Sequence, residues 1–135
     1  MTMFATAENL RLVDALCRTD FVSFIRKTFH TLAPNASLQM NFHIYALAFY
    51  LELVRLGVIT RLIINLPPRS LKSIVASVAF PAFVLGHDPT KHLIALSYNS
   101  DLAAKHANDC RAVMKSPAYG RPIAGSRSLF RKERL

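Results

Sequence analysis

The 135-residue chain contains no tryptophan, two cysteines and four glycines. Cys17 and Cys110 stand alone, without a Cys-x-x-Cys pair or a Cys/His cluster at zinc-ligand spacing. The sequence therefore predicts neither a disulfide framework nor a structural metal site. Isolated cysteines fit a reducing compartment, so we expect the protein in the cytoplasm.

Long hydrophobic runs are also missing. The two most apolar stretches, 42–56 and 74–86, are shorter than the roughly 20 residues that a bilayer-spanning helix needs. Glu52 and Arg55 interrupt the first stretch, and Pro81 interrupts the second. We therefore expect buried helices in both places, and no membrane among the partners.

Acidic residues are scarce: 8 Asp and Glu stand against 17 Lys and Arg, which gives a formal net charge of +9. Such a balance favours polyanionic partners such as nucleic acid or nucleotides, although it does not define a site. Residues 111–135 hold seven basic residues against Glu133 alone, which is +6 of the total +9. We interpret residues 120–135 as a basic C-terminal tail.

The first part of the chain has the pattern of helices. Apolar residues recur at helical spacing over 8–17 and over 20–32, so residues 1–40 are expected to form a helical N-terminal segment. A third helix is predicted to begin after Asn41 and to end near Gly57.

The rhythm then changes to alternating strands and helices. Short apolar runs predict strands over 61–66 and 92–98, and helices are expected over 72–85 and 101–115. This alternation is typical of a parallel sheet covered by helices, so the predicted fold class is α/β. Two strands leave such a sheet incomplete, and its uncovered apolar edges are expected to make the chain self-associate.

The junction between the first strand and its helix lacks glycine. It reads LPPRSLKS from Leu66 to Ser73, whereas a phosphate-binding loop reads GxxxxGK[ST] between a strand and a helix. The spacing leaves two readings open: a phosphate-binding loop, or a plain turn in which Arg69 and Lys72 remain in water. If the loop requires Leu71 at positive φ, the strain is on the order of 1–2 kcal/mol.

A family resemblance favours the first reading. The stretch RLIINLPPRSLKSIVASVAF and the residues that follow it, up to Tyr119, resemble the start of the ATPase domain of the large terminase subunit of tailed bacteriophages. This subunit is the motor that drives DNA into a capsid. Its loop often reads PPRxGKS, lacks the first glycine and sometimes has a bulky apolar residue in place of the second. We therefore interpret residues 41–119 as the N-terminal part of a P-loop, or Walker A, ATPase domain with an incomplete parallel sheet.

The resemblance implies a role for each residue of the loop, with ATP and Mg²⁺ as cofactors. Lys72 matches the phosphate-reaching lysine, Ser73 the magnesium ligand, and Arg69 the arginine thought to stabilise charge on the transferred phosphoryl group. His43 matches a histidine near the family's adenine site, and a polar residue at a helix start is the alternative reading. The phosphate cradle would be formed by Pro68, Arg69, Ser70 and Leu71.

Other parts of a working motor are missing. The second predicted strand ends in Ser97, Tyr98 and Asn99, where the family needs Asp followed by Glu to hold Mg²⁺ and to orient water. The carboxylate cluster of the family's nuclease domain is missing too. The chain thus resembles a truncated fragment, as in a decaying prophage, or a partial sequence, that binds ATP and does not hydrolyse it alone.

The partners of the full-length family are double-stranded DNA, the portal and the small terminase subunit, in the cytoplasm of a bacterial host. The first alternative is a non-catalytic basic remnant that binds nucleic acid through charge. A peripheral membrane protein ranks last, because residues 42–56 are apolar nearly all round and lack the charged face of an interfacial helix.

Overall fold

A computed structural model describes residues 7–120 of the chain, and the predicted basic tail lies beyond them except for Gly120. The longest helix has 16 residues, and within the described part no helix is both long and apolar enough to cross a membrane. In chain order the helices are α1 (Ala7–Thr19), α2 (Phe21–Leu32), α3 (Phe42–Arg55), the π-helix η1 (Ile74–Ala79), α4 (Phe80–His87), α5 (Ser100–Lys115) and α6 (Pro117–Gly120).

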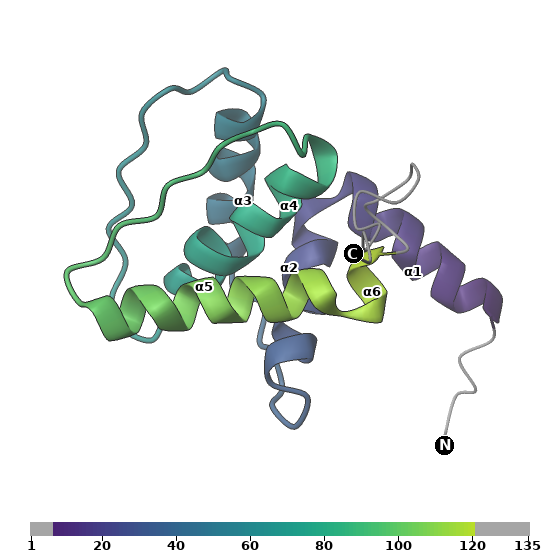
Figure 1. Cartoon of the computed structure of the whole chain (residues 1–135). Coiled ribbons are helices and arrows are strands. Elements are labelled where there is room, and N and C mark those ends of the chain that lie inside the picture. Colours follow the sequence, from purple (N-terminus) through teal and green to yellow (C-terminus); the bar gives the residue numbers. More distant parts are fainter. Residues whose placement is uncertain (1–6, 121–135) are drawn as a thin grey trace, which may run out of the picture.

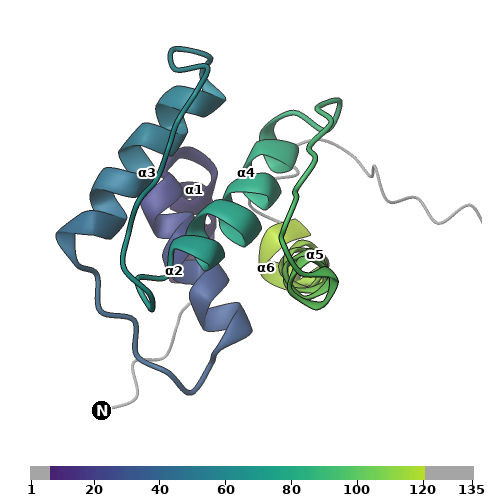
Figure 2. The same cartoon turned by 90° about the vertical axis from the view of Figure 1, so that its left-hand side faces the viewer.

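The predicted α/β fold with its P-loop-type parallel sheet is wrong, because residues 7–120 are all-helical and contain no strand. Residues 61–66 and 92–98 run as coil, and neither segment makes a backbone hydrogen bond to the other. Figure 2 shows them apart, the first beside α3 and the second on the α5 side of α4. A strand exists only where its N–H and C=O groups pair with a neighbouring strand, and these two segments are not neighbours.

Helices α1, α2, α3 and α5 lie close to the ranges predicted from their apolar periodicity, and side chains cap two of them. The Asp20 carboxylate accepts a hydrogen bond of 2.8 Å from the Ser23 N–H and so caps α2. Asn99 caps α5 in the same way, by accepting a bond of 2.8 Å from the Asp101 N–H. These caps satisfy backbone donors that a helix start leaves without an intrahelical partner.

A central helix, formed by η1 and α4 together, carries the core. It packs against α2, α3 and α5, which surround it in Figures 1 and 2. Val78, Ala79 and Ala82 are completely buried, and the Phe83 ring is 1% exposed. Phe83 lies 4.9 Å from the ring centroid of Phe21, so the central helix and α2 are joined by aromatic contacts.

The central helix has π geometry over Ile74–Ala79, and Pro81 offers a physical reason. The Phe80 N–H donates to the Val75 carbonyl, five residues back, instead of four. Proline has no N–H, and its ring crowds the carbonyl four residues before it, here that of Ser77. Widening the preceding turn relieves this crowding while the helix continues into α4.

Tyr119 joins the last helix to the central one. Its hydroxyl donates a hydrogen bond of 2.7 Å to the Ala82 carbonyl, and the side chain is buried. Burial raises the pKa of Tyr119 to about 12, because the anionic phenolate would lose its hydration there. Tyr119 therefore stays protonated in the folded protein at neutral pH.

We predict that Phe83→Ala lowers the free energy of unfolding by about 3–5 kcal/mol, because it leaves a cavity among α2, α4 and their neighbours. Urea denaturation followed by circular dichroism measures this change. Phe49→Ala is the matched control, since Phe49 lies on α3 with 60% of its surface exposed and should change stability little. Equal losses in both variants would contradict this description of the core.

We also predict that stability falls between about pH 10 and pH 12 in a way that depends on Tyr119. Above pH 10 the unfolded phenol ionises while the folded one stays neutral, so the stability present below pH 10 is lost as the pH rises. Tyr119→Phe should flatten this decline in denaturation curves measured across the range. Tyr98→Phe is the control, because Tyr98 is 94% exposed and its removal should leave the decline as it is.

Candidate functional site

The loop between residues 66 and 73 contains two left-handed residues. Arg69 has φ of 63° and Leu71 has φ of 62°, and they are the two non-glycine residues with positive φ in the described part of the chain. Alternation of left- and right-handed residues turns successive backbone N–H groups to one side of the chain, which makes an anion-binding concavity. Each residue costs on the order of 1–2 kcal/mol in this conformation, so the surrounding structure maintains the loop against strain.

The loop leads directly into the start of the central helix. The helix begins at Lys72, and its first backbone bond joins the Val75 N–H to the Leu71 carbonyl at 3.0 Å. The N–H groups before Val75 therefore have no intrahelical partner, and they carry the positive end of the helix dipole. Ser73 lies within this first turn, and its side chain makes no capping bond.

The Lys72 side chain folds back across the loop. Its ammonium group donates a hydrogen bond of 3.1 Å to the Leu66 carbonyl, and the residue is exposed. The bond closes a ring of residues 66–72 and places the positive charge over the loop. Arg69 is exposed as well, so two cations and several backbone donors gather at one place.

Ser70 lies between the two left-handed residues and is buried, with 8% of its surface exposed. Its hydroxyl oxygen has no hydrogen-bond partner. Its carbonyl lies 3.2 Å from Nε2 of His43, at the first turn of α3. A carbonyl only accepts, so Nε2 carries the proton and, in the neutral ring, Nδ1 is an acceptor.

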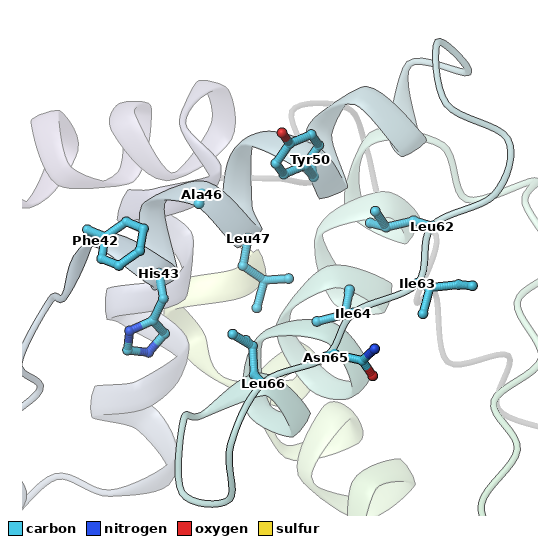
Figure 3. Close-up of a pocket in the computed structure, with 10 residues that line it drawn as sticks. All are labelled: Phe42, His43, Ala46, Leu47, Tyr50, Leu62, Ile63, Ile64, Asn65 and Leu66. Carbon is cyan, nitrogen blue, oxygen red and sulfur yellow. The ribbon is translucent and has the colours of Figure 1, made fainter.

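Two cavities meet at His43. The first, of about 340 Å³, lies between α3 and the segment that precedes the loop. In Figure 3 Leu62 and Ile64 point toward α3, whereas Ile63 and Asn65 point away from it. This cavity is mainly apolar, and its lining residues are Phe42, His43, Ala46, Leu47, Tyr50, Leu62, Ile63, Ile64, Asn65 and Leu66.

The second cavity, of about 300 Å³, lies on the other side of the loop and is more polar. Arg69 and Ser70 border it, together with Gln39 and Asn41. No acidic residue lines it, so its charge suits an anion or an uncharged polar group. Asn41, expected only as a helix cap, makes no capping bond and is instead available to this cavity.

The structure brings most of the predicted site residues together. Pro68 to Leu71 form the loop, Lys72 and Ser73 open the helix directly after it, and His43 reaches the loop through Ser70. A carboxylate site for Mg²⁺ is not present, because residues 7–120 contain no group of three His, Cys, Asp or Glu side chains that could hold a metal ion. Ser73 would therefore ligate a magnesium ion without a neighbouring carboxylate. Phosphate oxygens and water would supply the other ligands.

No family model matches the sequence, and no curated protein or solved structure matches it either. The resemblance to phage terminases thus depends on the loop and its flanking sequence.

We predict that Arg69→Gly raises the free energy of unfolding by about 0.5–1 kcal/mol, because relief of the left-handed strain exceeds the entropy that glycine loses. Leu71→Gly relieves the same strain but removes a half-buried side chain that packs against the core, so it should show no gain. Urea denaturation of both variants measures the difference. A loss in Arg69→Gly would show that residue 69 is not left-handed in solution.

Proposed function

We propose that residues 66–73 bind the phosphates of ATP, and that the chain is the ATP-binding part of a DNA-packaging motor of the phage terminase type. The observation that carries this proposal is the pair of left-handed residues, Arg69 and Leu71, directly before an open helix start. A plain turn between two segments needs no such strain. Strained backbone is concentrated at ligand clamps, where it preorganises donors.

Within residues 7–120 the loop is not flanked by a parallel sheet, so the fold class gives no support for ATP binding. Without a sheet in the described residues, the proposal depends on the loop itself and not on the architecture around it. Phosphate binding at a helix start requires only converging backbone N–H groups and the helix dipole, and both belong to the loop and its helix.

Each cation in the loop has a role under this proposal. Lys72 exchanges the Leu66 carbonyl for a phosphate oxygen, a charge-assisted and therefore stronger bond. Arg69, at the turn, adds a second positive charge and contacts the terminal phosphate. Ser73 supplies the one protein ligand for the magnesium ion that accompanies ATP.

The base contacts His43 in this arrangement. His43 borders both cavities, so a base in either of them lies against its ring. Nδ1, opposite the nitrogen bonded to Ser70, is free to accept a hydrogen bond from an exocyclic amine. The apolar cavity of about 340 Å³ has the volume and lining typical of small-molecule sites.

Under this proposal the chain binds ATP and does not hydrolyse it alone. Hydrolysis needs a carboxylate that orients the attacking water, and neither cavity beside the loop is lined by Asp or Glu. Packaging of double-stranded DNA, with the portal and the small terminase subunit in a bacterial cytoplasm, is thus a process in which this chain contributes nucleotide binding and other polypeptides contribute catalysis.

We predict that Lys72→Ala weakens ATP binding by roughly 10- to 100-fold, because a charge-assisted bond to phosphate is lost. Isothermal titration calorimetry with MgATP measures this change. Lys91→Ala, which removes another exposed lysine away from the loop, is the control and should bind ATP as the wild type does.

Equal ATP affinity in the wild type and Lys72→Ala would contradict the proposal. If neither protein binds ATP while both bind DNA with a steep salt dependence, the chain acts through its charge instead. AMP tests the base contacts without the terminal phosphates. It should bind more weakly than ATP in the wild type, and its affinity should change little with Lys72→Ala.

A further inference from the structure

The segment 92–98 exposes an apolar stripe. Ile94, Leu96 and Tyr98 are 88%, 92% and 94% exposed, and they alternate along the chain. In an extended segment such alternating residues point to the same side. Monomeric proteins rarely leave large apolar side chains so fully in water when they are contiguous.

The backbone of this segment is unpaired as well. None of the residues from His92 to Tyr98 takes part in a backbone hydrogen bond, and no side chain of the described residues bonds to them. Residues 61–65 show the same lack of backbone partners, and Ile63 is 88% exposed. Both segments lie on one side of the helices, the left-hand side of Figure 1 and the near side of Figure 2.

We propose that residues 92–98 form a homodimer interface, in which the segment pairs antiparallel with the same segment of a second copy of the chain. Pairing about a two-fold axis satisfies the N–H and C=O groups of alternate residues in both copies at once. This proposal goes beyond nucleotide binding and does not depend on it.

Charge identifies a second copy as the occupant. From His92 to Ser100 the sequence HLIALSYNS has no Asp, Glu, Lys or Arg, whereas the chain as a whole carries +9. Two such chains repel one another over most of their surfaces and can approach where charge is missing. An uncharged run of high β-propensity, free of proline and glycine, is the kind of segment that pairs with itself.

The antiparallel register also matches opposite charges at its ends. If Leu96 lies on the axis, Ile94 of one copy faces Tyr98 of the other, and Lys91 comes to the end where Asp101 of the second copy lies. The two pairs of Lys91 and Asp101 thus flank the apolar centre, which favours this register over a shifted one.

The exposed area is sufficient for a weak dimer. The three large side chains of the stripe each offer roughly 100–200 Å² of apolar surface. Their sum, on the order of 500 Å², is more than half of the roughly 800 Å² that each partner contributes to a standard interface. We therefore expect a reversible dimer whose population depends on protein concentration.

Sedimentation equilibrium over a range of concentrations tests this proposal on the full chain. The wild type should show a monomer–dimer equilibrium, and Leu96→Lys should raise the dissociation constant by about tenfold or more, because two lysines meet at the axis. Leu12→Lys makes the same exchange at a 63%-exposed position on α1 and should leave the constant unchanged.

Hydrogen exchange identifies the interface directly. Alternate amides within residues 93–98 should become protected as the wild-type concentration rises, because every second N–H donates to the partner strand, and they should stay unprotected in Leu96→Lys. A wild type that is monomeric at every soluble concentration overturns the proposal. So does a dimer that leaves these amides unprotected, or one that Leu12→Lys weakens as much as Leu96→Lys does.

Discussion

Burial of one helix is the constraint on which the rest of this structure depends. η1 and α4 pass through the centre of the molecule, and Val78, Ala79, Ala82 and Phe83 lose essentially all of their exposure to water there. The helices α2, α3 and α5 take their positions from this contact. The position of the loop also depends on this helix, because Lys72 and Ser73 belong to its first turn. The Leu71 side chain packs against the core and so holds its own backbone in the strained left-handed conformation.

The helices could be predicted from the sequence, and the sheet could not. Periodicity and capping residues such as Asp20 and Asn99 are local, so they indicate α2 and α5 without knowledge of the fold. The runs around Ile63 and Ile94 have the short apolar pattern of strands, and the strands predicted there are wrong because a strand also requires a partner within reach. No local pattern states whether the partner exists, and in residues 7–120 each run lies without one.

Some features of the candidate site could likewise be predicted from the sequence, and others could not. Spacing alone matches Lys72 and Ser73 to the end of the GxxxxGK[ST] pattern. The absent second glycine implies strain at Leu71 only if the loop requires positive φ there, and Leu71 has φ of 62°. The strain at Arg69 could not be predicted from the sequence, because an arginine after two prolines suits an ordinary turn equally well. The polar cavity could not be found from the sequence, because it forms only where residues 37–44 fold back against the loop.

The π-helix accommodates one extra residue between the loop and the core. A π turn contains one residue more than the α turn it replaces, and η1 contains this excess between the loop and Pro81. Removing this residue would restore α geometry and leave the loop and the buried residues of α4 in the same relative orientation, because the two kinds of turn cover the same rotation about the helix axis. An inserted codon in this stretch is thus accommodated within η1, and neither the loop nor the interior has to be redesigned.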